Sequence, residues 1–177
     1  MKIIAFGASY SSTSINRQLA GYAAHQFENS DIEVLDLNDY TVPLFTVDVE
    51  AKIGHPQLVK DFLHKLEEAD LLIISMAENN GSYAAAFKNL FDWTSRVKGN
   101  LFEGKKMLLM ATSPGARGGR SVLNAALDRF PRHGAEIIAS FSLPAFNANF
   151  STTEGITNAA LQQEFKKVVQ QVKEHYV

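Results

Sequence analysis

The chain has 177 residues, 46% of them hydrophobic, which suits one domain with a sizeable core. Its 17 basic and 19 acidic residues give a formal net charge of −2, which argues against the broad basic face that nucleic-acid binding requires. The absence of cysteine excludes disulfides, thiolate metal sites and cysteine nucleophiles.

Short apolar runs alternate along the chain with segments of helical periodicity. The runs predict strands at 2–6, 33–37, 71–75, 106–112 and 135–141, and the periodic segments predict helices at about 14–27, 57–69, 83–97, 120–130 and 158–176. Such alternation predicts an α/β fold, a doubly wound parallel sheet with helices on both faces. The strand order 2-1-3-4-5 is a common solution for five strands. The stretches 40–55 and 145–157 are predicted loops or lids.

No apolar run approaches the roughly 20 residues that are needed to cross a bilayer. The run at the start of the chain stops at Gly7, which is too soon for the apolar region of a signal peptide. We therefore expect a cytoplasmic protein with no membrane partner.

The loop after the first strand is rich in hydroxyl groups. It holds five serine or threonine residues between Ser9 and Ser14. Hydroxyls and the free N–H groups of a helix start form an anion site, which the helix dipole strengthens. The spacing matches neither the G-x-G-x-x-G of dinucleotide folds nor the G-K-[ST] of P-loops, so a phosphate monoester held by neutral donors fits better. A lone serine at position 14 would more simply cap the helix.

Two further loops should meet the first one, because ligands of open α/β sheets bind beyond the carboxyl ends of the strands. Residues 77–82, after the third strand, are dense in hydrogen-bonding side chains. Residues 112–120, after the fourth strand, have three glycines in five positions, which lets backbone approach a planar ligand closely. Either loop alone could be an ordinary turn. Because both lie at the same edge of the predicted sheet, a shared binding site is favoured.

At these loops the sequence resembles the NADPH-dependent FMN reductase family, which includes quinone, azo-dye and chromate reductases of flavodoxin-like fold. The family's first motif, approximately G-S-x-R-x-x-S-x-N-x-x-L-A, stands at residues 8–20 as ASYSSTSINRQLA. The second, approximately P-E-Y-N-x-S-x-P-x-x-L-K-N-x-x-D-W, stands at residues 77–93 as AENNGSYAAAFKNLFDW. The glycine-rich segment at 113–119 also matches in kind and position. The resemblance spans the whole chain and implies one flavodoxin-like, flavin-binding domain over residues 1–177.

The resemblance also implies a set of flavin-binding residues in the three loops. The FMN phosphate would be held by Ser9, Ser11, Ser14, Ile15 and Asn16. The ring and ribityl chain would be lined by Ala77, Glu78, Asn79, Asn80, Gly81 and Ser82. The other side of the ring would meet Ser113, Pro114, Gly115 and Gly118. Structural roles in fixing the helix near a dimer contact are implied for Lys88, Asn89, Asp92 and Trp93.

The chain departs from the family at Ser11, where the family has an arginine. A hydrogen bond to a charged group contributes roughly 1.5–3 kcal/mol, so we expect weaker FMN binding unless Arg17 or Arg117 compensates. The family arginine is also a candidate contact for the 2′-phosphate of NADPH, which leaves the choice between NADPH and NADH open. Ala77 and Ala84 replace two prolines, which implies a less rigid second loop.

The implied function is hydride transfer from NADPH or NADH through bound FMN to a quinone, an azo compound, a metal oxyanion or free flavin. No protein acid or base is obligatory, so we nominate no catalytic residue. The resemblance implies a homodimer or homotetramer.

An electron-transfer flavodoxin that does not oxidise NAD(P)H is the alternative, and the net charge of −2 speaks against it because flavodoxins are strongly acidic. A hydrolase is disfavoured because no G-x-S-x-G elbow is present, and a metal site because H-E-x-x-H and clustered carboxylates are missing.

Overall fold

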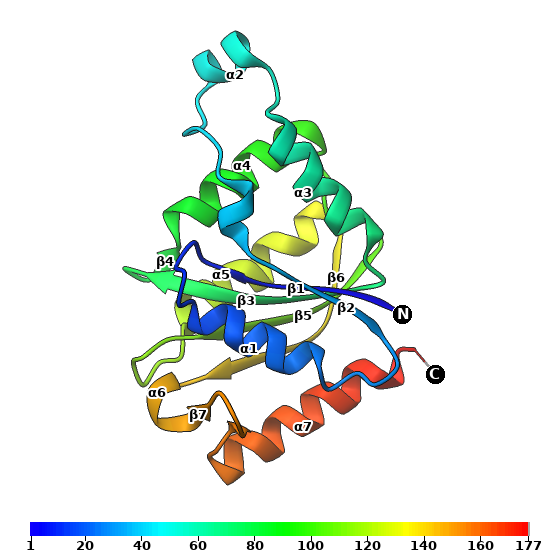
Figure 1. The fold of residues 1–177 in the computed structure, drawn as a ribbon, viewed down its shortest axis with the longest axis vertical. Helices are drawn as coiled ribbons and strands as arrows, with labels where there is room; N and C mark the ends of the chain where they lie inside the picture. Colours follow the sequence, from blue (N-terminus) through cyan, green and yellow to red (C-terminus); the bar gives the residue numbers. More distant parts are fainter. Residues whose placement is uncertain (177) are drawn as a thin grey trace.

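The computed structural model describes residues 1–176 and places a mainly parallel sheet between two layers of helices (Figure 1). The five parallel strands are β1 Lys2–Ala8, β2 Asp31–Leu35, β3 Leu71–Asn79, β5 Lys105–Thr112 and β6 Ala135–Leu143. They pair in the order β2-β1-β3-β5-β6, which is the predicted 2-1-3-4-5 order. The doubly wound fold predicted from the alternation of strands and helices is therefore confirmed.

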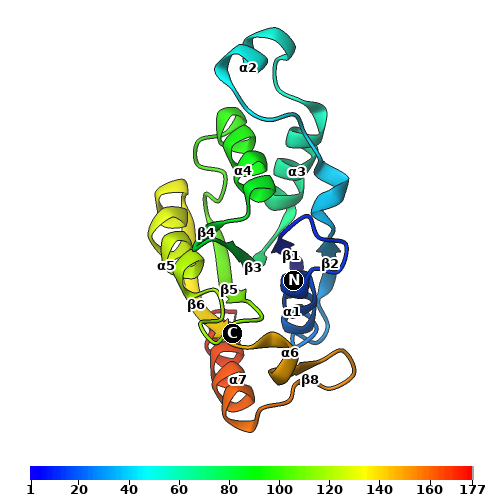
Figure 2. The same ribbon diagram turned by 90° about the vertical axis from the view of Figure 1, so that its left-hand side faces the viewer.

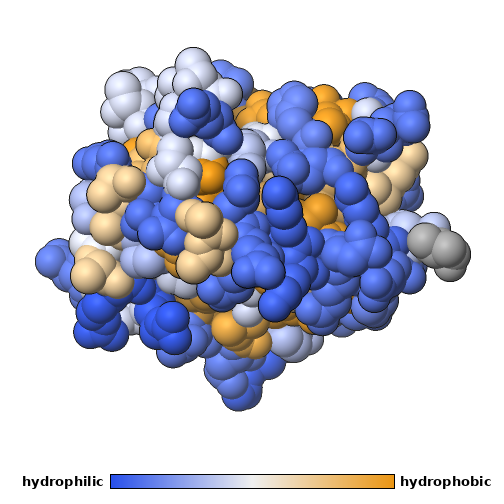
Figure 3. Space-filling model, turned by 90° about the horizontal axis from the view of Figure 1, so that it is seen from below, coloured by the Kyte–Doolittle hydropathy of each residue, from blue (hydrophilic) through white to orange (hydrophobic). Residues whose placement is uncertain are grey.

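Five long helices cover the sheet: α1 Ile15–Ala24, α3 Gln57–Glu68, α4 Ala85–Val97, α5 Arg120–Arg129 and α7 Ala159–Glu174. Helices α3, α4 and α5 lie on one face, and α1 and α7 lie on the other (Figures 1 and 2). Each face carries its own apolar core, because the side chains of the central strands alternate between the two layers. Seen from the α7 side, the outer surface is mostly hydrophilic (Figure 3). Among residues 1–176, no helix has the length and apolarity to span a bilayer.

All five strands differ from their predicted bounds by one to four residues at an end, and the ends of β2 and β3 have local causes. Strand β2 ends at Leu35 rather than 37, because the Asp36 carboxylate accepts a hydrogen bond from the Asn38 N–H at 3.0 Å and caps the 3₁₀ helix η1, Leu37–Tyr40. Strand β3 continues to Asn79 and turns back into β4, Ser82–Tyr83. The loop predicted at 77–82 is therefore a hairpin that extends the sheet.

The two stretches predicted as loops contain short elements. Residues 40–55 include the helix α2 Val47–Ile53, and residues 145–157 include α6 Phe146–Asn149 and the hairpin of β7 Phe150–Ser151 with β8 Gly155–Ile156. Helix α2 buries none of its residues, so its sequence carries no apolar stripe. These elements are too short for a periodic pattern to reveal.

Residues 41–56, here called the arm, project away from the sheet at the end of the molecule where α2 lies (Figure 1). The Asn89 side chain on α4 donates to the Pro43 carbonyl at 3.0 Å and accepts from the Phe45 N–H at 2.8 Å. The indole N–H of the fully buried Trp93 donates to the same carbonyl at 2.7 Å. The K-N-x-x-D-W segment thus fixes the base of the arm to α4.

Candidate functional site

A cleft of about 280 Å³ opens at the carboxyl ends of β1, β3 and β5, where the strand order reverses. It is lined by Ser9, Ser11, Thr13, Ser14, Ile15, Asn16, Ala77, Glu78, Asn79, Thr112, Ser113 and Pro114. The structure therefore brings together predicted residues from all three loops. It leaves five of the predicted residues off the cleft wall: Asn80, Gly81, Ser82, Gly115 and Gly118. Thr13 and Thr112 also line the cleft; both lie in loops that the sequence marked, but neither was nominated as a binding residue.

The first loop leads into α1 by a close approach of helix and strand. A Cβ atom at Gly7 would lie 2.3 Å from the Arg17 nitrogen and 2.6 Å from the Asn16 carbonyl carbon. Ser14 caps the helix, since its hydroxyl accepts a hydrogen bond from the Arg17 N–H at 3.1 Å. The N–H groups of Ile15 and Asn16 have no acceptor among residues 1–176. They remain available to an anion in the cleft.

The hydroxyls of this loop bond one another only loosely. The Ser9 hydroxyl accepts from the Ser11 N–H at 3.2 Å, and the Ser11 hydroxyl accepts from the Thr13 N–H at 3.3 Å. The Ser11 and Thr13 hydroxyl oxygens lie 3.4 Å apart. These long contacts leave hydroxyl protons free to turn toward a ligand, so the loop presents neutral donors to the cleft.

Neither arginine that could replace the family arginine lines the cleft. Arg17 forms an ion pair with Asp36 and donates to the Ser12 carbonyl at 3.0 Å, so its guanidinium braces the loop from outside. Arg117 donates to the Ser121 hydroxyl at 3.0 Å. The wall of the cleft therefore offers hydroxyls, free backbone N–H groups and the helix dipole, and no arginine.

A tyrosine anchors the same loop to the core. The hydroxyl of Tyr10 donates to the Tyr40 carbonyl at 3.1 Å. Burial raises the pKa of Tyr10 to about 12, so this hydroxyl stays protonated as a donor at neutral pH.

The side chain of Asn16 forms hydrogen bonds within the protein, and the residue forms the floor of the cleft. Its Oδ1 accepts from the Ser75 hydroxyl at 2.7 Å and from the Thr112 N–H at 3.1 Å, and its Nδ2 donates to the Thr112 carbonyl at 3.3 Å. The residue is 4% exposed. These bonds tie the first turn of α1 to β3 and β5. The side chain thus positions the helix, and the backbone N–H is the group of Asn16 that remains without a partner among residues 1–176.

The second loop forms the tight turn of the hairpin between β3 and β4. Asn80 and Gly81 have φ values of 50° and 75°, as in the two-residue type I′ turns of hairpins. Ladder pairing of Glu78 with Tyr83 and of Asn79 with Ser82 holds the turn. The turn is therefore held by ladder pairing although the two family prolines are replaced by alanine.

Glu78 joins this loop to α5. The N-cap of α5 is Gly119, which has no side chain to cap the helix. The Glu78 carboxylate instead accepts from the Val122 N–H at 3.0 Å and complements the helix dipole. The second loop, which forms one wall of the cleft, is thereby tied to the start of α5.

The glycines of the third loop serve the packing of the protein. A Cβ atom at Gly118 would lie 2.5 Å from the Ser142 hydroxyl and 2.8 Å from the Pro144 nitrogen, and its φ is +59°. Gly115 turns its carbonyl toward the Ala145 N–H at 2.9 Å. These contacts place the two glycines against the end of β6 and residues 144–145, and neither glycine lines the cleft.

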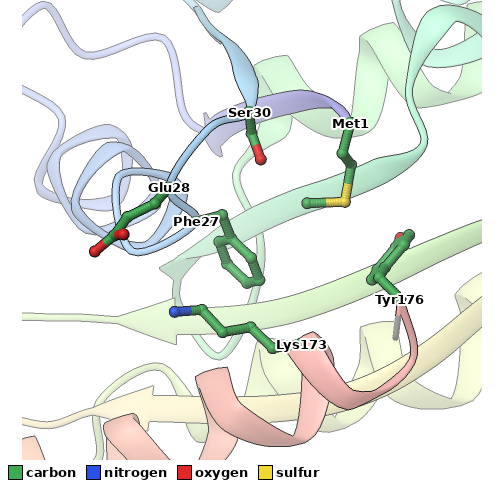
Figure 4. Close-up of a pocket in the computed structure, with 6 residues that line it drawn as sticks. All are labelled: Met1, Phe27, Glu28, Ser30, Lys173 and Tyr176. Carbon is green, nitrogen blue, oxygen red and sulfur yellow. The ribbon is translucent and has the colours of Figure 1, made fainter.

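A second hollow, of about 330 Å³, lies at the opposite edge of the sheet beside Met1, and Figure 4 shows it. The side chains of Phe27 and Lys173 approach each other there, with the ammonium 5.7 Å from the ring centre. None of the predicted site residues lines it. It also lacks the helix start that makes the first cleft an anion site.

Comparison with known proteins matches residues 1–149 to the family model for NADPH-dependent FMN reductase. The chain belongs to this family. An NAD(P)H-dependent FMN reductase of Pseudomonas aeruginosa is 30% identical over 142 residues, covering 76% of this chain and 75% of the relative. An NADPH:quinone oxidoreductase of Arabidopsis thaliana is 31% identical over 125 residues, covering 68% of this chain and 62% of the relative.

Solved structures agree with this membership at the level of the fold. FerB, a flavoenzyme NAD(P)H:(acceptor) oxidoreductase from Paracoccus denitrificans, superposes with a TM-score of 0.77 at 21% identity and covers 98% of each chain. Flavodoxin 1 from Bacillus cereus superposes with a TM-score of 0.59 at 16% identity, covering 98% of each chain. The chain therefore has the flavodoxin-like fold.

Proposed function

We propose that this chain is an NAD(P)H oxidoreductase that uses FMN to pass hydride from NADPH or NADH to a quinone, an azo compound, a metal oxyanion or free flavin. The observation that carries the proposal is the hydroxyl-rich loop, which places free donors before α1 at the switch point of the sheet in a member of the FMN reductase family. We further propose one flavin-binding domain over residues 1–177 and a cytoplasmic location.

The residues present fit FMN. Its phosphate would be held by the hydroxyls of Ser9, Ser11, Thr13 and Ser14 and by the N–H groups of Ile15 and Asn16. Its ring would lie between the walls formed by residues 77–79 and by residues 112–114. Bound FMN supplies the hydride chemistry, and the protein supplies position and electrostatics. The hydrogen bond that the Val122 N–H donates to the Glu78 carboxylate keeps the wall of residues 77–79 in place.

Steady-state kinetics test the proposed activity. Oxidation of NADPH and of NADH is followed at fixed FMN with a quinone as acceptor, and again without an acceptor. We expect turnover that requires FMN and increases with the quinone. An electron-transfer flavodoxin would leave both nicotinamides unoxidised, and this result would overturn the proposal.

Restoring the family arginine gives a sharper test. Ser11 lines the cleft and stands at the family's arginine position, so we expect Ser11→Arg to tighten FMN binding by a factor of roughly ten to one hundred. Ser12→Arg is the matched control, since Ser12 is exposed and does not line the cleft. Equal affinities of Ser11→Arg and the unaltered protein for FMN, measured by fluorescence titration, would contradict the assigned phosphate position.

We also propose that the chain forms homodimers through the arm. The arm carries Leu44, Val47 and Ile53, which are 76%, 69% and 49% exposed, on a base that Asn89 and Trp93 hold firmly. Exposed apolar groups on a fixed projection mark an interaction surface. We expect Leu44→Ser with Val47→Ser to lower the mass measured by light scattering, while Val34→Ser, on exposed β2, leaves it unchanged. A monomeric unaltered protein would refute the proposal.

A further inference from the structure

Arg117 is the one basic residue in the three loops that meet at the cleft, which are residues 9–16, 77–82 and 113–118. It is exposed, and it follows the cleft-lining Pro114 by three positions in the chain. Three residues of chain span at most about 11 Å, so the backbone of Arg117 lies within that distance of the cleft wall. The third loop therefore carries a cation at the rim of the cleft, and the sequences of the other two loops carry none.

The third loop holds the backbone around Arg117 in place. Beyond β5 this loop projects past the sheet beside α6 (Figure 1). The Gly115 carbonyl accepts from the Gly118 N–H at 3.2 Å and from the Ala145 N–H at 2.9 Å. A side chain on such a turn can discriminate between ligands, because the loop does not have to be ordered when a ligand binds.

The guanidinium of Arg117 has few partners within the protein. Arginine has five N–H donors, and Nη2 of Arg117 donates to the Ser121 hydroxyl at 3.0 Å. Arg117 makes no ion pair with any residue of 1–176, whereas Arg17 is paired with Asp36. The dipole of α5 disfavours a cation beside the start of that helix, so the charge of Arg117 does not stabilise it. Most donors of this guanidinium thus remain available to an anion at the rim.

We propose that Arg117 binds the 2′-phosphate of NADPH and so makes this chain prefer NADPH to NADH. The inference rests on the proposed oxidoreductase function. The cleft of about 280 Å³ is too small to enclose FMN and a dinucleotide together, so the adenosine end of the nucleotide lies outside it, against the rim. Ser11 stands at the position of the family arginine, so the first loop offers the 2′-phosphate no cation. The third loop offers Arg117, whose planar guanidinium suits a phosphate.

Steady-state kinetics with both nucleotides test the assignment. We expect a KM for NADPH at least about tenfold below the KM for NADH. Arg117→Gln should raise the KM for NADPH toward that for NADH, and Arg117→Lys should keep part of the preference because it keeps the charge. Lys166→Gln, which removes an exposed cation on α7, is the matched control and should behave as the unaltered protein does. Equal KM values, with turnover that requires FMN, would refute the role of Arg117 and leave the proposed function intact.

Binding of nucleotide fragments gives a readout that does not depend on turnover. With the protein saturated by FMN, calorimetric titrations compare adenosine 2′,5′-bisphosphate with adenosine 5′-monophosphate, which lacks only the 2′-phosphate. We expect the bisphosphate to bind at least about tenfold more tightly, and Arg117→Gln to remove this difference. The same preference in a protein that oxidises neither nucleotide would support the role of Arg117 and overturn the proposed function. Equal affinities in the unaltered protein, or a preference that survives Arg117→Gln, would overturn the assignment.

Discussion

Replacing Gly7 with alanine is expected to destabilise the protein severely and to abolish FMN binding. The added Cβ would meet backbone atoms, 2.3 Å from the Arg17 nitrogen and 2.6 Å from the Asn16 carbonyl carbon, and backbone cannot turn aside as a flexible side chain can. Relief requires α1 to move away from β1, which would shift the helix start that faces the cleft. Overpacking of this kind costs about 1–3 kcal/mol and occasionally more. Urea unfolding measures the loss directly.

The matched control for this substitution is Gly99→Ala. No atom lies within 4 Å of a Cβ built at Gly99, and its φ is outside the left-handed region. We expect its unfolding midpoint to stay close to that of the unaltered protein. If Gly7→Ala unfolds at the same urea concentration as Gly99→Ala, the close contact of helix and strand is not what holds the first loop.

Replacing Asn16 with alanine is expected to weaken FMN binding although the side chain does not face the ligand. The substitution leaves the Ser75 hydroxyl and the Thr112 N–H, both buried, without their acceptor. An unsatisfied buried group costs roughly 1–3 kcal/mol, and the first turn of α1 loses its link to β3 and β5. We expect a lower free energy of unfolding and an FMN dissociation constant raised at least about tenfold.

Asn16→Asp distinguishes positioning from simple loss of a contact. The aspartate keeps the size of the side chain but turns an acceptor toward the Thr112 carbonyl, where Asn16 donates at 3.3 Å. It should therefore be as damaging as Asn16→Ala. Asn124→Ala, at an exposed position on α5, is the control and should change neither stability nor FMN affinity. Intact FMN affinity in both Asn16 variants would contradict the role of this side chain.

The sequence predicted the sheet because its signals are local. Apolar runs such as residues 71–75 mark buried parallel strands, and the spacing of Phe62 and Leu66 marks the inner face of α3. The bounds of β2 were wrong because the capping of η1 by Asp36 outweighs the apolar character of Leu37. Helix α2 was missed because a helix without a buried face has no periodic pattern.

The sequence predicts which loops meet at the cleft better than it predicts the contacts that individual residues make there. The hydroxyl run at residues 9–14 and the loops after β3 and β5 are visible in sequence, and the fold brings them to one cleft. The partners of Asn16, Glu78 and Gly118 are far from them in the chain, and a local pattern carries no information about them. The side chains of Asn16 and Glu78 and the backbone at Gly118 thus also have scaffold contacts that a local pattern does not reveal.

In the binding mode that we propose, hydroxyls, backbone N–H groups and the helix dipole hold the phosphate of FMN without an arginine. Parallel fluorescence titrations with FMN and with riboflavin, which lacks the phosphate, test it most directly. We predict saturable binding of one FMN per chain, with a dissociation constant on the order of 1–100 µM and binding of riboflavin at least about tenfold weaker. Equal affinities for the two flavins, or no binding of FMN in this range, would contradict this mode of phosphate binding.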